Sequence, residues 1–223
     1  MTVLFFGRYK EKYSQKIFLL LKKYFRKVDV IWSKTYNEKI TKKLKSKYDY
    51  IFTFRSYLIL KNNTIKKAKI AAINFHPGPP KYRGVGCANY AIYEKSKFYG
   101  VTAHLIAPQI DSGKIIDITK FEISEKISLD ILLSKTHLAQ YYMAKKTIIG
   151  IAKNKDYLNN QIKNNIKNKW SKKIGNKKKL DKFYRLSRIN LTNEELARYL
   201  RSTLYKNFKP YIRIKDKFFR YDN

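Results

Sequence analysis

The stretch that decides the fold covers residues 74–84 and has the sequence Asn-Phe-His-Pro-Gly-Pro-Pro-Lys-Tyr-Arg-Gly. It begins where an apolar run, residues 70–75, predicts a strand, and its prolines and glycines predict a turn-rich loop. A second junction of this kind follows, where the strand predicted at 101–106 leads to Asp111-Ser-Gly113. An amide, an imidazole and a carboxylate therefore all follow strands, which is how α/β enzymes place polar groups on loops held by a rigid sheet.

Strands and helices alternate along the first 150 residues or so. Short apolar runs predict strands at residues 3–7, 28–32, 50–54, 70–75, 101–106 and 114–123. Apolar residues at helical spacing predict helices at 14–24, 37–47, 87–96 and 128–154. This alternation predicts an α/β fold with a largely parallel sheet and helices on both faces. Ligands bind such sheets beyond the carboxyl ends of the strands, where Asn74, His76 and Asp111 fall.

The remaining residues predict a smaller C-terminal part. It consists of a Lys- and Asn-rich surface connection, a short helix and a β-hairpin, at residues 153–180, 192–204 and 211–221. The helix begins with a capping box, Thr192-Asn-Glu-Glu195, and the hairpin turns at Lys215-Asp216. We therefore predict one main domain over residues 1–155 and a small C-terminal subdomain over residues 156–223.

Composition limits the class of protein. The chain has 223 residues, of which 44% are hydrophobic and 15% aromatic, enough to build a buried core. No apolar run is long enough to span a bilayer, and the first residues predict a strand in place of a signal peptide. A single cysteine, Cys87, excludes an internal disulfide and fits a reducing compartment. We therefore expect a cytoplasmic protein without membrane association.

The formal charge of +34 raises the question of a nucleic-acid partner, because clustered basic residues neutralise phosphates. Only ten of the 50 basic residues are arginines, and the lysines are dispersed along the whole chain among Ile, Asn and Tyr. That mixture is typical of AT-rich coding and favours solvated faces over a dedicated polyanion groove. Nucleic acid is therefore not the expected partner, although the charge would steer an anionic small substrate.

The residue types in the two loops suit transfer of an acyl group to an amine. The Asn74 amide can donate to a developing oxyanion, a contact worth roughly 3–4 kcal/mol. His76 is suited to proton handling, because the ordinary pKa of histidine, ~6.5, is near working pH. Asp111 can hold the imidazole or a bridging water and accept the proton. No nucleophile or cluster of metal ligands competes, so we expect direct transfer without a metal.

Structural interpretations of single motifs compete with this one. A lone His-Pro-Gly is usually a turn, and Asp-Ser-Gly is a common β-turn. Their joint occurrence, each after a predicted strand, favours the functional interpretation. Three other residues are interpreted as structural: His104 as a satisfied residue of an apolar strand, His137 as part of the long helix, and Cys87 as packing at a helix start.

The combination of Asn74-x-His76-Pro, Gly100-Val-Thr-Ala-His104 and Asp111-Ser-Gly113 resembles the formyltransferases that use N10-formyltetrahydrofolate. The resemblance covers roughly residues 1–150, with a weaker similarity at 194–210. It implies a Rossmann-like formyltransferase domain with a small C-terminal helix and hairpin. It also implies that Asn74, His76 and Asp111 are the catalytic set and that N10-formyltetrahydrofolate is the formyl donor.

The loop at residues 76–87, His-Pro-Gly-Pro-Pro-Lys-Tyr-Arg-Gly-Val-Gly-Cys, resembles the sugar N-formyltransferases. Those enzymes formylate nucleotide-linked aminodeoxysugars for surface polysaccharide, such as dTDP-4-amino-4,6-dideoxyglucose or its 3-amino equivalent. Glycinamide ribonucleotide formyltransferases carry a Gly-rich phosphate loop after the first strand, and residues 7–13 lack it. Methionyl-tRNA formyltransferases usually carry His-Pro-Ser-Leu-Leu-Pro and a C-terminal barrel, and this sequence predicts neither feature. A methionyl-tRNA formyltransferase-like enzyme and a basic nucleic-acid-binding module on a formyltransferase-like shell remain the alternatives.

The resemblance also implies ligand contacts. In the family, backbone groups that correspond to two short segments cradle the pteridine, here Phe54, Arg55, Ser56 and Tyr57, and Ala107, Pro108 and Gln109. For the sugar and the diphosphate we expect contacts from Arg8, Lys81, Tyr82 and Arg83, although a solvated-loop role for Lys81 and a surface role for Arg55 and Tyr57 stay open. Since short C-terminal hairpins help sugar N-formyltransferases to form dimers, we also expect a homodimer.

Overall fold

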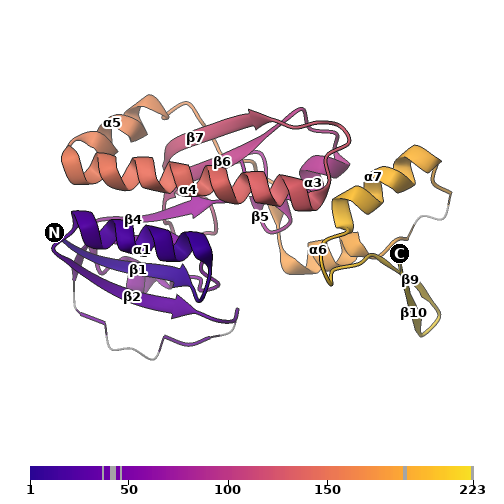
Figure 1. Cartoon of the computed structure of the whole chain (residues 1–223), viewed down its shortest axis with the longest axis horizontal. Helices are drawn as coiled ribbons and strands as arrows, with labels where there is room; N and C mark the ends of the chain where they lie inside the picture. The colour runs from indigo at the N-terminus through magenta and orange to yellow at the C-terminus, as the bar shows by residue number, and fades with distance from the viewer. Residues whose placement is uncertain (37, 41–43, 46, 188–189, 222–223) are drawn as a thin grey trace.

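The computed structural model describes residues 1–221 except 37, 41–43, 46, 188 and 189. Its centre is a six-stranded sheet with the strand order β2-β1-β3-β4-β6-β7, drawn in Figure 1. The strands are β1 Thr2–Arg8, β2 Lys27–Ser33, β3 Tyr48–Phe54, β4 Ala68–His76, β6 Phe98–Leu105 and β7 Ile115–Glu122. The first four run parallel and the last two pair antiparallel, which confirms the predicted α/β fold with a largely parallel sheet.

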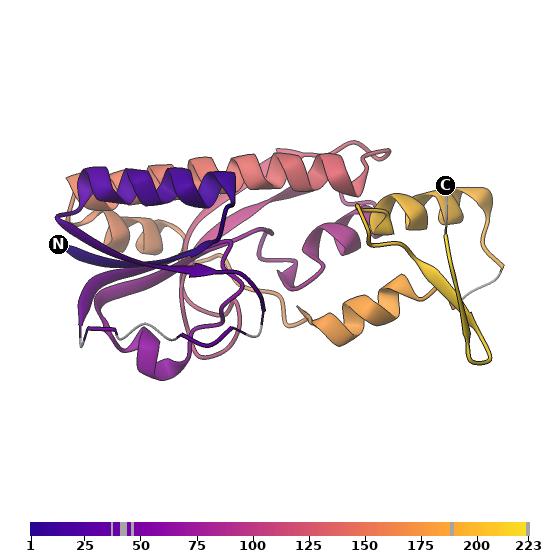
Figure 2. The same cartoon turned by 60° about the horizontal axis from the view of Figure 1, so that its bottom comes forward.

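One face of the sheet is covered by two helices, α1 (Lys12–Tyr24) and α4 (Leu129–Lys153), which lie above it in Figure 2. Alternate strand residues such as Phe5, Phe52 and Ile73 point to this side and form the largest buried cluster with both helices. The long helix predicted at 128–154 is confirmed, and Ser128 caps it by accepting a hydrogen bond from the Ile131 amide.

The other face carries less helix than the sequence predicts. Its apolar cluster, which includes Leu4, Phe6 and Ile51, is covered by loops and by the four-residue helix α2 (Asn62–Ile65). A helix was expected at 37–47, but residues 38–40, 44, 45 and 47 are not helical, and the remainder of that range lies outside the described residues. Loops therefore line this face, beside the carboxyl ends of the parallel strands.

The predicted surface connection at 153–180 is wrong in part. Helix α5 (Tyr157–Asn164) packs Leu158 and Ile162 into the main core, and a second helix, α6 (Lys177–Tyr184), follows. Leu158 and Ile162 are four positions apart, so they share one face of the helix. The Lys- and Asn-rich surroundings hid this short pattern. The domain boundary after residue 155 stays a prediction.

The C-terminal part begins its last helix as expected. Helix α7 (Asn193–Thr203) has the predicted capping box formed by Thr192 and Glu195. It packs against α3 (Cys87–Tyr93), where the buried Asn89 amide donates to the Ser202 carbonyl at 2.8 Å. The predicted hairpin is also present as β9 (Tyr211–Ile214) and β10 (Lys217–Arg220), and it projects from the body in Figure 2.

Among the described residues, no helix is long and apolar enough to cross a bilayer.

Candidate active site

The end of strand β4 supplies the first two polar groups of the site. Asn74 and His76 are two residues apart and therefore point to the same side of the sheet. The Thr53 hydroxyl on the neighbouring strand donates to Asn74 Oδ1 at 2.6 Å. This bond orients the Asn74 amide so that Nδ2 lies 3.2 Å from His104 Nε2 on β6, directly across the pair of strands.

The loop between β6 and β7 brings Asp111 to the same place. Asp111 has left-handed backbone geometry, with φ of 45°, which an aspartate in a turn tolerates. Its carboxylate lies between two imidazoles, with Oδ2 3.2 Å from His76 Nδ1 and Oδ1 3.3 Å from His104 Nε2. Oδ2 also accepts the Gly84 amide at 3.0 Å. The structure thus unites the three predicted residues with His104.

One backbone carbonyl and one carboxylate define the protonation of His76. Its Nε2 lies 2.8 Å from the Tyr82 carbonyl and must donate to it, while Nδ1 faces the Asp111 carboxylate. An imidazolium satisfies both partners. Burial lowers the pKa of His76, but Cys87, Asp111 and the Tyr82 carbonyl raise it more, and the net direction is upward.

The pKa of Asp111 changes in the complementary direction. Burial raises it, whereas the charge of His76, the hydrogen bond and charge of His104 and the Gly84 amide lower it, and the lowering prevails. The two directions agree on an ion pair between His76 and Asp111. Because the His76 side chain is 3% exposed and that of Asp111 is 9% exposed, this pair is nearly dry.

The loop after His76 is fixed from β6 and α4. The Tyr99 and Thr102 hydroxyls donate to the Pro77 and Gly78 carbonyls, both at 2.8 Å, and the Gln140 amide donates to the Phe75 carbonyl. All three donor side chains are buried. They hold the backbone around His76 in one conformation, which polar groups of an enzyme need for their alignment.

Close packing explains why the third residue of the His-Pro-Gly motif, Gly78, is a glycine. A Cβ at Gly78 would approach His76 Nε2 to 2.8 Å and the Tyr82 carbonyl oxygen to 2.9 Å. The hydrogen bond between those two atoms therefore requires a residue without a side chain at this position.

Sequence reasoning missed two residues that the structure brings into the site. His104 was interpreted as a residue of the sheet alone, yet it contacts both Asn74 and Asp111. Its position opposite Asn74 in the strand pair is the signal that could have found it. Trp170 belongs to the segment expected on the surface, but its indole lies 5.0 Å from the His104 ring and 5.6 Å from the His76 ring.

Cys87 is more than packing. It lies at the start of α3 and is buried, as expected. Its Sγ is 3.6 Å from His76 Nε2 and 3.1 Å from the Gly84 carbonyl oxygen, to which the thiol donates. The thiol therefore belongs to the immediate surroundings of the imidazole.

The predicted ligand residues at the ends of β1 and β3 form one group. Arg8 donates through Nε to the Arg55 carbonyl at 3.0 Å, and its guanidinium lies 4.1 Å from the centre of the Tyr57 ring. The Arg55 guanidinium is nearly buried, and its Nε lies 3.5 Å from Glu11. Glu11 also caps α1, so the carboxylate that pairs with Arg55 is already engaged by two backbone amides. The result is an electropositive edge next to the strand that carries His76.

Residues 81–83 have structural partners. Lys81 pairs with Glu94 at 3.1 Å, and the buried Tyr82 donates its hydroxyl to the same carboxylate at 2.9 Å. Arg83 donates to the Ile110 carbonyl through both Nε and Nη2, at 2.9 and 2.7 Å. These contacts tie the loop after His76 to the loop that carries Asp111.

The two segments predicted to hold the pteridine flank one region. Residues 54–57 end β3, and residues 107–109 follow Ile106, whose amide donates to the Ala72 carbonyl at 2.7 Å. Leu58 and Ile106, which adjoin these segments, pack against the same apolar cluster on the loop-covered face of the sheet. An apolar surface of this kind fits a flat heteroaromatic group.

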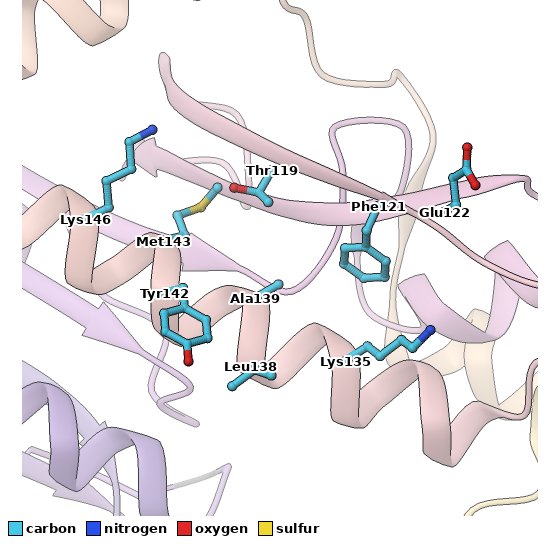
Figure 3. A pocket seen from close by; sticks show the side chains of 9 residues that line it. All are labelled: Thr119, Phe121, Glu122, Lys135, Leu138, Ala139, Tyr142, Met143 and Lys146. Atoms are coloured by element: carbon cyan, nitrogen blue, oxygen red, sulfur yellow. The ribbon is translucent and has the colours of Figure 1, made fainter.

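Two hollows lie on the surface of the main sheet and its loops. One, of about 510 Å³, lies between β7 and α4 and is lined largely by carbon atoms of residues such as Leu138, Tyr142 and Met143 (Figure 3). The other, of about 380 Å³, adjoins Gly113 and Trp170 and has Arg83, Lys114 and Lys169 among its lining residues. In the described part of the chain, no group of three His, Cys, Asp or Glu side chains could hold a metal ion.

Fold and site together define a class. An amide donor and a buried imidazole–carboxylate pair at the carboxyl edge of an α/β sheet can stabilise an oxyanion and accept a proton, which are the functions that an acyl-transfer enzyme needs. Residues 9–148 match the family model described as formyl transferase. Since this match covers more than half of the chain, the protein belongs to the formyl transferase family.

Curated relatives share part of this chain. It is 36% identical over 112 residues to the bifunctional polymyxin resistance protein ArnA of Wigglesworthia glossinidia brevipalpis, covering 50% of this chain and 17% of that protein. It is 28% identical over 111 residues to methionyl-tRNA formyltransferase of Finegoldia magna, covering 48% of this chain and 36% of that enzyme. The chain thus spans well under two thirds of the length of these relatives.

Solved structures share the fold over nearly the whole chain. A likely sugar N-formyltransferase from Mycobacterium tuberculosis superposes with a TM-score of 0.71 at 19% identity, covering 95% of this chain and 91% of that one. An N-formyltransferase from Helicobacter canadensis, solved with folinic acid and dTDP-3-aminofucose, superposes with a TM-score of 0.69 at 20% identity, covering 96% and 84%.

Proposed function

We propose that this protein transfers a formyl group from N10-formyltetrahydrofolate to the amine of a nucleotide-linked aminodeoxysugar. The observation that carries the proposal is the convergence of Asn74, His76 and Asp111, with Asp111 held between two imidazoles. The resemblance of the loop at residues 76–87 to sugar N-formyltransferases supports the acceptor class. The shared fold of solved sugar N-formyltransferases agrees with it.

Asn74 would stabilise the charge that develops on the formyl oxygen. One N–H of its amide faces His104, and the other remains for a substrate oxygen. Asn74 is also only partly buried, so a ligand can reach it. A donor that Thr53 already orients loses little entropy when it binds the oxyanion.

His76 would act as a fixed positive charge. Both of its ring nitrogens already have partners in the structure, and its side chain is 3% exposed. Its contribution is therefore electrostatic, through stabilisation of the oxyanion at short range and of the ionised form of Asp111. This role differs from the proton handling that the sequence suggests for His76.

Asp111 would accept the proton that the attacking amine releases. Its ionised form is stabilised by His76, which keeps it able to act as a base at neutral pH. His104 would hold this carboxylate in place, because its Nε2 lies 3.3 Å from Asp111 Oδ1 and its Nδ1 donates to the Leu105 carbonyl. Direct transfer to the amine needs no covalent enzyme intermediate.

The formyl donor would bind beside Asn74 on the loop-covered face of the sheet. Residues 54–57 and 107–109 would hold its pteridine, and their apolar neighbours Leu58 and Ile106 fit a flat ring. When bound, the donor supplies the activated formyl group. The chain's own contribution is to orient that group toward Asn74 and to keep water from the buried ion pair.

The acceptor's diphosphate would lie along the electropositive edge. The parallel ladders end with Phe54 beside Phe75 and Gly7 beside Phe54, and Arg55 and Arg8 are the residues that follow. Neighbouring strands are about 4.8 Å apart, so the backbones of the two arginines lie roughly one to two strand spacings from that of His76. A hexose between amine and diphosphate spans a distance of this order. We keep Arg8 as a substrate contact and assign Lys81, Tyr82 and Arg83 a supporting role in the loop.

Methionyl-tRNA as acceptor is the second candidate. Methionyl-tRNA formyltransferases are among the curated relatives, and the charge of +34 would favour a polyanion. Turnover that collapses over a small increase in salt would indicate this acceptor, because tRNA binding releases many counterions. A doubly anionic nucleotide sugar would show only a modest dependence.

An acceptor panel tests the proposal. The purified chain is incubated with N10-formyltetrahydrofolate and, separately, with dTDP-3-amino and dTDP-4-amino sugars, charged initiator tRNA and glycinamide ribonucleotide. Mass spectrometry then detects the gain of one formyl group. We expect formylation of an aminosugar nucleotide. Formylation of tRNA alone, or of no acceptor by a chain that binds folate, would reject the acceptor assignment.

A further inference from the structure

The segment at residues 165–175 is bound across both catalytic loops. On the side of the Asp111 loop, the Asn165 amide donates to the Ile116 carbonyl at 2.9 Å, and Trp170 Nε1 donates to the Gly113 carbonyl at 2.8 Å. On the side of the loop after His76, the Ser171 amide donates to the Pro80 carbonyl at 3.0 Å. The segment was predicted to be a surface connection, but it joins the loop after His76 to the loop that carries Asp111.

A two-residue strand pair completes the attachment. Strand β8 (Ile174–Gly175) pairs in parallel with β5 (Arg83–Gly84), next to the Gly84 amide that binds Asp111. Gly84 has a φ of +85°, and a Cβ there would collide with the Gly175 carbonyl oxygen. The close approach of these two backbones requires glycine, so the position of the segment is built into the sequence.

Trp170 uses this attachment to reach both imidazoles. Its indole makes T-shaped contacts with the two rings, at interplanar angles of 75° to His76 and 82° to His104. Its Nε1–H is satisfied by the Gly113 carbonyl. Trp170 also lines the hollow that has Lys114 and Lys169 in its lining, whereas neither His76 nor His104 lines it.

We propose that Trp170 is a positioning residue that fixes the planes of the two imidazoles on the Asp111 carboxylate and stabilises the cationic form of His76. A cation over the face of an aromatic ring, within ~6 Å of the ring centre, is attracted by the ring quadrupole, and T-shaped contacts between aromatic rings are directional. The inference rests on the catalytic roles proposed for His76 and Asp111, but its first test needs no turnover.

Several groups besides the indole influence the charge of His76. Asp111 faces it from the loop between β6 and β7, Cys87 faces it from α3, and the Tyr82 carbonyl faces it from its own loop. His104 on β6 shares the carboxylate. A variant at position 170 must leave these groups in place. We therefore compare only apolar replacements of Trp170, because they keep water away from the imidazoles.

The direct experiment is a pH titration by NMR of the full chain labelled with ¹³C-histidine. The chain has three histidines, so three ring signals are expected, and His76→Asn and His137→Gln variants assign them. We compare the wild type with Trp170→Phe, which keeps an aromatic ring, and Trp170→Leu, which keeps only apolar bulk. Trp170→Leu should lower the His76 midpoint by about half a unit to one unit, whereas Trp170→Phe should lower it less.

His137 supplies an internal control. It lies on α4, where burial, Arg55, Arg8 and Lys206 lower its pKa to about 3. Its signal should stay in the neutral position over the pH range of the titration in all three proteins. An identical His76 midpoint in wild type, Trp170→Phe and Trp170→Leu would overturn the proposal. A moved His137 signal would show that a variant had changed the fold.

A second readout covers the case in which Trp170→Leu does not fold. Trp32→Phe leaves Trp170 as the single tryptophan, and a protonated imidazole in contact with an indole quenches its fluorescence. The emission should fall with the same midpoint as the His76 NMR signal, and the His76→Asn substitution should remove that step. An emission independent of pH would contradict the contact.

Measurements of turnover then distinguish a positioning role of Trp170 from a purely structural role. With the formyl donor and an aminosugar nucleotide, Trp170→Leu should lower kcat by roughly tenfold with KM little changed, and Trp170→Phe should restore most of it. The alkaline limb of the rate should also move to lower pH in Trp170→Leu. If NMR shows the shift but no acceptor is formylated, the positioning role stands and the proposed function fails.

Discussion

Asp111 receives a hydrogen-bond donor or a cation from three different segments, and this explains how a carboxylate can stay ionised where water is nearly excluded. His76, His104 and the Gly84 amide all face its two oxygens. A buried unpaired carboxylate would become neutral instead. The same contacts hold the side chain in one orientation. The residue that accepts the proton in our proposal is thus both charged and fixed.

The first prediction concerns this carboxylate. Asp111→Asn keeps the shape but loses the charge, so the His76 imidazolium loses its partner and the amine loses its base. We expect kcat to fall by about 10²- to 10³-fold, with the protein still folded. Steady-state kinetics and circular dichroism measure the two quantities. Asp117→Asn, which removes the exposed pair with Lys146, is the matched control and should leave kcat within about twofold.

Combining variants tests whether the residues act as a unit. Asn74→Ala and His76→Asn should each lower kcat strongly, and the triple variant with Asp111→Asn should be little worse than the poorest single variant. Additive losses would mean that the three residues act independently, contrary to our account.

The second prediction concerns pH. The pKa of His76 lies above its ordinary value in the folded protein, so the ion pair stabilises the fold below pH ~6.5 and is lost as pH rises through the folded pKa. Because the active form carries the cation, kcat should fall on this same alkaline side. Asp111 determines the change on the acid side. Its contribution to the stability of the fold is present above pH ~3.8, the ordinary pKa of an aspartate, and is lost as pH falls through its lowered pKa.

Rate profiles and urea unfolding over the same pH range measure both effects. His76→Asn should remove the alkaline loss of stability along with most of the turnover. A wild-type rate that keeps rising through and beyond the His76 titration would show that neutral His76 is the active form.

At the residue scale, the sequence was enough to predict that Asn74, His76 and Asp111 lie at one edge of the sheet, because their motifs are local. It was not enough for His104, whose role depends on the strand register, or for Trp170, whose role depends on a fold-back over 94 residues from His76. Contacts between distant segments leave no spacing pattern in one sequence. Buried polar or aromatic residues in unexpected places, such as a histidine within an apolar strand, are the signal that remains.

The loop after His76 owes its shape to other elements. Its own sequence predicts a turn, but the carbonyls of Pro77 and Gly78 are satisfied by hydroxyls of β6, and that of Phe75 by the Gln140 amide of α4. A buried carbonyl without a partner costs about 1–3 kcal/mol, so these donors favour one loop conformation over its alternatives. Strand β6 thus supports the site as well as supplying His104.

The third prediction compares two buried threonines. Thr102→Val removes the donor to the Gly78 carbonyl, while Thr136→Val removes a donor to the Leu132 carbonyl within its own helix. Both should destabilise the fold by about 1–2 kcal/mol, measured by urea unfolding. Only Thr102→Val should also lower kcat, by roughly tenfold, because only its loop carries His76. Equal turnover in the two variants would show that the loop needs no external support.

At the element scale, long periodic segments were predictable and short ones were not. The twenty-five residues of α4 contain many apolar positions, and its start and end were predicted within one residue. Helix α5 has only three core residues, Tyr157, Leu158 and Ile162, among polar neighbours, so packing against β7 stabilises it more than its own sequence does. The loop-covered face of the sheet was likewise not predictable, because alternation of elements does not fix the length of each helix.

At the scale of the whole molecule, the C-terminal hairpin is the least covered element. Ile212, Ile214, Phe218 and Phe219 are between 39% and 61% exposed. An isolated two-stranded hairpin is marginally stable in water, and exposed apolar clusters of this kind mark interfaces. We therefore maintain the prediction of a twofold homodimer in which the hairpin packs on the second copy.

The fourth prediction tests this interface. Replacing Ile214 and Phe219, which lie on one face of the hairpin, with Ser should convert a dimer to a monomer in sedimentation velocity at micromolar concentration. The matched control replaces Leu19 and Ile59, two equally exposed apolar residues of the main domain, with Ser. The control should remain dimeric. A wild-type chain that sediments as a monomer would reject the dimer.

The central claim is that Asn74, His76 and Asp111 transfer a formyl group to an aminosugar nucleotide. Its most direct test is a single-turnover reaction with ¹³C-formyl-labelled N10-formyltetrahydrofolate and dTDP-aminosugar, followed by NMR, with wild type and Asp111→Asn in parallel. We predict that the label appears as an amide formyl on the sugar with wild type and is slowed at least about 10²-fold with Asp111→Asn. Equal rates for the two proteins, or label that never leaves the donor in the presence of wild type, would contradict the account.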